Sequence, residues 1–225
     1  MTYGLLSATP FFTTAPIGPE LQVGALLLGL AIAIVFHEVA HGYVALRLGD
    51  PTAQLAGRLT LNPIKHIDLW GTILLPAMLL IVSRGQFAFG WAKPVPVNYY
   101  NLRYGKYGPV LVALAGPLTN LLLLIFFATL IRLSPAGTAL PMLFAQIAMI
   151  NGFLMLFNLI PIPPLDGSKV LYVFLEHRQD IIVWLERYGT FALLALLILG
   201  DKLLFSFVFQ PAVWLTQLFA GGIFF

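Results

Sequence analysis

The amino-acid sequence predicts an all-α polytopic membrane protein, and its composition and its apolar stretches carry this prediction. Hydrophobic residues make up 60% of the chain and charged residues only 9%, whereas about a quarter of the residues in soluble proteins are charged. Several apolar stretches, two of them without any charged residue, are long enough for a helix that crosses a bilayer, which needs roughly 20 residues. The net charge of +3 therefore reflects basic residues beside membrane spans, and no nucleic acid is expected as a partner.

Four stretches are predicted to cross the lipid bilayer, and the cell membrane is the expected location. The stretch 71–83 is apolar but short, so we expect a re-entrant or partly inserted helix there. The last predicted span contains Asp201 and Lys202, which leaves its ends open, and the tail 210–225 is either interfacial or part of another span. The predicted spans are 21–46, 109–131, 139–160 and 188–209.

Basic residues are concentrated between the first two of these spans. If 71–83 does not cross the membrane, this region faces the cytoplasm, because loops rich in Lys and Arg stay inside. A crossing at 71–83 would instead place them on both sides. In the first case the end of the first span lies in the cytoplasmic half of the membrane. The seven basic residues are Arg47, Arg58, Lys65, Arg84, Lys93, Arg103 and Lys106.

The first span contains the sequence His37-Glu38-Val39-Ala40-His41, an H-E-x-x-H motif. Residues i and i+4 share one face of a helix, so both imidazoles can bind one zinc ion. Glu38, next to the first histidine, is placed to act as general base in metal-assisted peptide hydrolysis. Ionisable groups inside a membrane span are costly and usually functional, which favours a metal site over an accidental match.

The third zinc ligand is expected to be Asp166. A catalytic zinc ion usually has three protein ligands, and the chain has four histidines and no cysteine. Asp166 follows three prolines in Asn158-Leu-Ile-Pro-Ile-Pro-Pro-Leu-Asp-Gly167, which prevent a continuous helix. Broken backbone at membrane depth is tolerated where it is buried in protein or lines a wet cavity. Alternatively, Asp166 caps a following helix, whereas His66 and His177 lie in polar stretches and are predicted to be surface histidines.

Together these motifs resemble the site-2 protease family of intramembrane zinc metalloproteases. That family is marked by H-E-x-x-H in one transmembrane helix and N-x-x-P-x-x-P-L-D-G in a later one, which the chain matches at 37–41 and 158–167. The stretches 59–68, 90–98 and 115–120 look like the small prokaryotic branch. The resemblance implies a site-2 protease-like transmembrane core with a broken helix at the aspartate motif.

The resemblance also implies which residues form the active site. His37, His41 and Asp166 would bind one Zn²⁺ ion, and Glu38 would be the catalytic base. Many relatives carry a PDZ or CBS domain, for which this sequence has no room. We therefore expect residues 1–225 to form a single membrane-embedded metalloprotease domain.

Three further positions are implied near the substrate. Asn158 and Pro164 correspond to positions that orient the substrate, and the Asn158 amide can donate hydrogen bonds to a substrate carbonyl or a developing oxyanion. The alternative for Asn158 is capping of a helix end. Asn120 corresponds to a polar position beside the site, where it either contacts substrate or makes a hydrogen bond between helices.

The predicted function is intramembrane proteolysis, the hydrolysis of peptide bonds in or near a transmembrane segment of another protein. A helical substrate must first unwind, and 87–97, with alternating side chains and two prolines, is predicted to be an extended strand or sheet edge at the membrane surface that pairs with it. Substrate choice then arises in this domain, from a regulatory membrane partner or from a homo-oligomer. The alternative is a non-catalytic membrane metal-binding protein or metal carrier, which has no need of Glu38.

Overall fold

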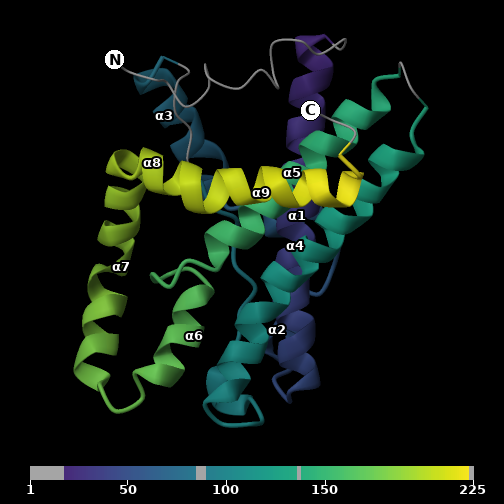
Figure 1. The fold of residues 1–225 in the computed structure, drawn as a ribbon. Helices are drawn as coiled ribbons and strands as arrows, with labels where there is room; N and C mark the ends of the chain where they lie inside the picture. The colour runs from purple at the N-terminus through teal and green to yellow at the C-terminus, as the bar shows by residue number, and fades with distance from the viewer. Residues whose placement is uncertain (1–17, 85–89, 136–137, 223–225) are drawn as a thin grey trace.

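The computed structural model describes residues 18–84, 90–135 and 138–222, in which every regular element is helical and no strand is present (Figure 1). The prediction of an all-α membrane protein is therefore confirmed. The longer helices are α1 (Pro19–Arg47), α4 (Tyr107–Leu133), α5 (Leu140–Asn158), α7 (Gln179–Leu199) and α9 (Gln210–Ala220). The shorter elements are α2 (Thr52–Leu55), α3 (Leu75–Val82), α6 (Gly167–Phe174), α8 (Asp201–Leu204), the 3₁₀ turns η1 (Pro63–His66) and η3 (Tyr99–Asn101), and the π-helical turns η2 (Leu69–Leu74) and η4 (Phe205–Phe209).

Five helical stretches of the described residues are long and apolar enough to cross a membrane, which makes the chain a multi-pass membrane protein. The first three agree with the spans predicted at 21–46, 109–131 and 139–160. The apolar stretch 69–82 forms a shorter helix, as its length predicted. The five stretches are Pro19–Arg47, Tyr107–Leu133, Leu140–Asn158, Gln179–Leu199 and Asp201–Ala220.

The prediction of one span over 188–209 is wrong. Helix α7 ends one residue before Gly200, and helical residues resume directly after it and run to Ala220. A Cβ atom at Gly200 would lie 2.4 Å from the carbonyl oxygen of Leu196, so only glycine permits this close turn. Of the two alternatives for the tail, the structure bears out the one in which it belongs to a further helix of span length.

Helices α1, α4 and α5 form the central bundle, and α9 crosses over α4 and α5 (Figure 1). At the crossing, Ala128 and Ile131 of α4 meet Ala145 of α5 and Ala220 of α9. Small side chains at these positions let the helices approach closely, as is common where helices pack in membranes. The bundle thereby holds the half of α1 that carries the H-E-x-x-H motif against α4.

The chain is not helical between α5 and α6, where the sequence predicted a broken helix. Helix α5 ends at Asn158 and α6 begins at Gly167, with an irregular segment between them. The prolines of this segment lack the N–H group that a helix needs and clash with the preceding turn. The break places Asp166 at the start of α6 and allows it to turn back toward α1.

A strand was expected over 87–97, and the structure differs there. Residues 87–89 lie outside the described residues, and 90–97 form no strand. The reason is that this segment, which we call the cleft segment (residues 90–97), has no neighbouring strand. Its N–H groups bond instead to separate elements: that of Lys93 to the His66 carbonyl (2.9 Å) and that of Val95 to the Glu38 carboxylate (2.7 Å).

Asp50 connects the end of α1 to the residues that follow the cleft segment. Its carboxylate is fully buried and accepts hydrogen bonds from the Asn98 N–H (2.7 Å), the Asn101 side chain (3.0 Å) and both the N–H and the hydroxyl of Thr52. Burial opposes the charge, but the donors outweigh it and lower the pKa of Asp50. The carboxylate is thus a clamp between two loops on the side of the molecule where α1 ends.

We expect Asp50→Ala to lower the free energy of unfolding by about 3 kcal/mol at pH 7, because it leaves buried donors without an acceptor. Because the folded pKa is lowered, the stabilisation by Asp50 is present above its unfolded pKa of about 3.9. It is lost as the pH falls through the lower, folded value. Thermal unfolding in detergent measures both effects, with the exposed Asp201→Ala as the control; equal melting temperatures for the two variants would contradict the clamp.

Candidate metal centre

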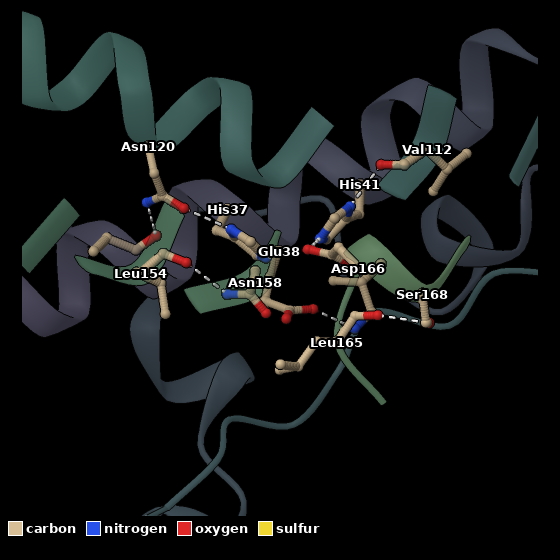
Figure 2. A network of polar contacts seen from close by, with 12 residues as sticks. His37, Glu38, His41, Val112, Asn120, Leu154, Asn158, Leu165, Asp166 and Ser168 are labelled. Atoms are coloured by element: carbon tan, nitrogen blue, oxygen red, sulfur yellow. Dashed lines mark hydrogen bonds and ion pairs between the residues drawn. The ribbon is translucent and has the colours of Figure 1, made fainter. Parts of the chain in front are cut away.

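Two histidines of α1 and one aspartate at the start of α6 converge on one point (Figure 2). His37 and His41 are buried and lie one helical turn apart. The Oδ2 atom of Asp166 lies 3.1 Å from Nε2 of His37 and 3.4 Å from Nε2 of His41. Residues 125 or more positions apart in the sequence are therefore brought within coordinating reach of a single ion.

Hydrogen bonds on the far side of each imidazole fix which nitrogen faces Asp166. Nδ1 of His37 lies 2.6 Å from Oδ1 of Asn120, and Nδ1 of His41 lies 2.7 Å from the Val112 carbonyl oxygen. A carbonyl oxygen can only accept, so each Nδ1 carries the proton and each Nε2 presents a lone pair. The orientation of the Asn120 amide is fixed in turn, because its NH₂ group donates to the Asn151 side chain at 3.0 Å.

The donor set fits a zinc ion. Tetrahedral zinc with bonds of about 2.0–2.1 Å keeps its ligand atoms about 3.3 Å apart, close to the separations of Asp166 Oδ2 from the two imidazoles. The Oδ2 atom of Asp166 is buried without a hydrogen-bond partner, and the two Nε2 lone pairs beside it cannot donate to it. Acceptors that face one another in this way need a cation to stabilise them.

Helix α4 leaves space for such an ion at Gly116. A Cβ atom at this position would lie 2.5 Å from Nε2 of His41 and 2.6 Å from Nε2 of His37. Gly116 therefore places no side chain in the region next to the two Nε2 atoms. It packs directly against the pair of histidine rings.

The candidates for the third ligand differ in their surroundings. Asp166 occupies the N-cap position of α6, yet its side chain makes no capping hydrogen bond. His177 is exposed, as predicted. The prediction of a surface location for His66 is wrong: it is 2% exposed, and its Nε2 lies 2.9 Å from the Thr60 carbonyl oxygen. His66 holds the loop after α2 rather than a metal.

Glu38 lies beside the metal site and not in it. Its Oε2 accepts a hydrogen bond from the Val95 N–H at 2.7 Å, which holds the carboxylate from the cleft segment. A cleft of about 220 Å³ opens in front of Glu38, His37, His41 and Asp166. A carboxylate held by a single donor keeps acceptor capacity for a water molecule, as a general base requires.

The structure separates the three residues predicted to contact substrate. Asn158 and Pro164 line the cleft. Asn158 is also the last residue of α5, and its NH₂ group donates to the Leu154 carbonyl at 3.0 Å, which leaves a second N–H for another acceptor. Asn120 is fully buried and contacts His37 rather than the cleft, so we assign it a positioning role.

Sequence reasoning missed several residues that shape the site. Asn151 supports Asn120 and is fully buried on α5; an asparagine within an apolar span was the signal that could have indicated it. The Val95 amide is a backbone group, so nothing in the residue type reveals its bond to Glu38. Tyr99 and Lys169 also line the cleft, and neither belongs to a motif that carries chemistry.

We expect Asn120→Ala to weaken zinc binding about 10- to 100-fold, the usual effect of removing a group that orients a metal-binding histidine. Asn120→Asp keeps an oxygen opposite Nδ1 of His37 and should retain more of the affinity. Competition with a chelator in detergent measures both, with Thr216→Ala, a buried polar residue on α9, as control. Wild-type affinity in Asn120→Ala would show that the contact does not orient the ring.

The fold and the site define a membrane protein with the metal centre of a zinc metalloprotease, and comparison with known proteins agrees. The family described as "Peptidase family M50" matches residues 134–200. The Bacillus subtilis protein named "Putative zinc metalloprotease YwhC" is 37% identical over 83% of this chain and 93% of its own length. The Mycolicibacterium smegmatis protein named "Putative zinc metalloprotease Rip2" is 30% identical over 81% of this chain and 71% of its own. The chain belongs to peptidase family M50, the site-2 protease family; the comparison with solved structures gave no match.

Proposed function

We propose that this protein is an intramembrane metalloprotease that uses one zinc ion to hydrolyse peptide bonds in or near transmembrane segments of other proteins. The observation that carries the proposal is the convergence of His37, His41 and Asp166 beside Glu38. The two histidines and Glu38 belong to a helix long and apolar enough to cross the membrane. A metal site with an adjacent free base is what metal-assisted hydrolysis needs.

The roles of the residues follow from their positions. When bound, zinc supplies a Lewis acid that polarises the scissile carbonyl and makes water more acidic. Glu38 accepts the proton of the attacking water and passes it to the leaving amine, while the Val95 N–H keeps its carboxylate on the cleft side. The second N–H of Asn158 is available to the substrate carbonyl or to the oxyanion that develops from it.

The size of the cleft favours an unwound substrate. Its volume of about 220 Å³ is below the roughly 300–1,000 Å³ that is common for small-molecule sites. A helix with its side chains is about 10–12 Å wide, so we propose that substrate reaches the zinc as an extended chain. Pro94 of the cleft segment lacks an N–H group, and the N–H groups of Lys93 and Val95 are already bonded within the protein. The cleft segment therefore offers the substrate mainly carbonyl groups, which accept hydrogen bonds.

We also propose the placement of the protein in the cell. The basic loops between α1 and α4 would face the cytoplasm of a cell membrane, which puts the site in the cytoplasmic half of the bilayer. Residues 1–225 would act as one membrane domain. Its substrates would be other membrane proteins, and regulation would come from membrane partners or self-association.

Metal removal tests the proposal. In liposomes that contain the purified protein and capped single-span peptides, a zinc chelator should abolish cleavage, and about one equivalent of zinc should restore it. Mass spectrometry of the products should place the cut in or beside the apolar segment. Cleavage that continues in the chelator, or cuts only in soluble extensions, would overturn the proposal.

A further inference from the structure

Lys169 lies at the edge of the cleft, three residues after the proposed zinc ligand Asp166. Among the described residues that line the cleft, it is the one with a cationic side chain. It projects from α6, and its Nζ lies 4.8 Å from the ring centre of Tyr172 and 5.6 Å from that of Tyr99. Tyr99 follows the cleft segment and, like Lys169, lines the cleft, so the ammonium group lies beside the space that a substrate would occupy.

The charge of Lys169 is only loosely neutralised within the protein. The carboxylate that pairs with it is Glu186 of α7, at 3.7 Å, which is longer than a hydrogen bond. The Glu186 side chain is 55% exposed and that of Lys169 25%. Exposed ion pairs of this kind contribute little to stability, so a better-placed carboxylate inside the cleft can replace Glu186.

A polypeptide substrate has few kinds of anionic group that could lie beside the Lys169 ammonium group. An extended substrate in the cleft carries negative charge only on Asp and Glu side chains or on a chain terminus. An acidic side chain in or near a transmembrane segment is costly unless it is paired. A lysine at the mouth of the cleft gives it a partner in a medium of low dielectric, where the attraction is stronger than in water.

On this basis, and resting on the proposed protease function, we propose that Lys169 is a specificity-determining residue that binds an acidic side chain of the substrate close to the scissile bond. When no substrate is present, the Glu186 carboxylate pairs with the Lys169 ammonium group, and the substrate carboxylate displaces it when the substrate binds. Tyr99 and Tyr172 hold the lysine stem and the charge in place through their ring faces. Cleavage would then select transmembrane segments that carry Asp or Glu at one defined distance from the cut.

The test measures binding separately from cleavage. Capped single-span peptides of leucine and alanine carry one Asp or one Asn, moved position by position through the central third, so that only a side chain brings a carboxylate. Their affinity is measured with zinc-loaded Glu38→Gln protein in detergent. At one position we expect the Asp peptide to bind about tenfold more tightly than the Asn peptide, as for a charge-assisted hydrogen bond.

Variants of Lys169 and Glu186 then show whether Lys169 binds the acidic side chain of the substrate or only joins α6 to α7 through its ion pair with Glu186. Lys169→Met should reduce the Asp preference to within about twofold, Lys169→Arg should keep it, and Glu186→Gln should increase it because the competitor is gone. Lys106→Met is the matched control, since Lys106 also pairs with a glutamate and a tyrosine but lies outside the cleft. Zinc content confirms that each variant is folded.

Two results would overturn the inference: no position with an Asp preference, or the same loss of preference in Glu186→Gln as in Lys169→Met, which would identify a structural tie. The proposed function is judged on a different result. If the protein with Glu38 intact holds zinc and cleaves none of the peptides, the protease function fails, and the binding data still decide the role of Lys169.

Discussion

Glu38→Gln is expected to abolish peptide cleavage while the protein keeps its zinc. The loss of a general base lowers the rate by about 100- to 10,000-fold. Zinc should remain because Glu38 is not one of the three converging ligands, and a glutamine side chain has the same size. Its amide oxygen can still accept the hydrogen bond from the Val95 N–H. Cleavage of a single-span peptide in liposomes and zinc content by metal analysis measure the two quantities.

This variant also separates the protease from the metal carrier. A carrier needs His37, His41 and Asp166 but has no use for a base beside them, so Glu38→Gln would leave metal transport intact. Glu20→Gln, at the exposed start of the same helix, is the matched control and should cleave at the wild-type rate. Undiminished cleavage in Glu38→Gln would refute the base assignment, and loss of zinc would show that Glu38 belongs to the metal site.

Much of the fold could be predicted because a membrane span can be recognised from the length and the apolar composition of a stretch of sequence. The stretches of α1, α4 and α5 are predominantly apolar, and their length identifies them as spans despite the polar residues that they contain. The end of α7 could not be predicted in this way. Asp201 and Lys202 follow Gly200 but are flanked by apolar residues on both sides, and the break depends on the close approach of Gly200 to Leu196. The strand expected over 87–97 failed for a related reason, since alternation of side chains does not supply a partner strand.

The residues of the candidate site were easier to predict from the sequence than the contacts that hold them in place. His37, Glu38 and His41 lie on one helix, where spacing fixes their relative positions. The approach of Asp166 to α1 depends on the tertiary fold, and the sequence indicated it through the proline break, the need for a third ligand and the resemblance of the 158–167 motif. The Asn120 to His37 bond joins residues 83 positions apart, and no local pattern reports such a contact. The same holds for Lys169, whose proposed role depends on Tyr99 and Glu186 from other elements.

Gly116→Ala tests how closely α4 approaches the metal centre. The new methyl carbon would fall 2.5 Å from Nε2 of His41 and 2.6 Å from Nε2 of His37, which is nearer than real Cβ contacts allow. Either the histidine rings rotate away from Asp166, or α4 moves away from α1 and breaks the bond between Asn120 and His37. Both responses disturb the ligands, so we expect zinc affinity to fall at least about 100-fold, and cleavage to fall with it.

Gly24→Ala on α1 is the control, since a Cβ atom there would meet nothing within 4 Å. Alanine is favoured over glycine in a helix by about 1 kcal/mol, so both substitutions increase helix propensity and differ in their surroundings. Gly24→Ala should therefore keep zinc and activity, whereas Gly116→Ala should lose both while it remains helical by circular dichroism. If Gly116→Ala binds zinc as the wild type does, α4 does not border the ion, and the space beside the histidine rings has another purpose.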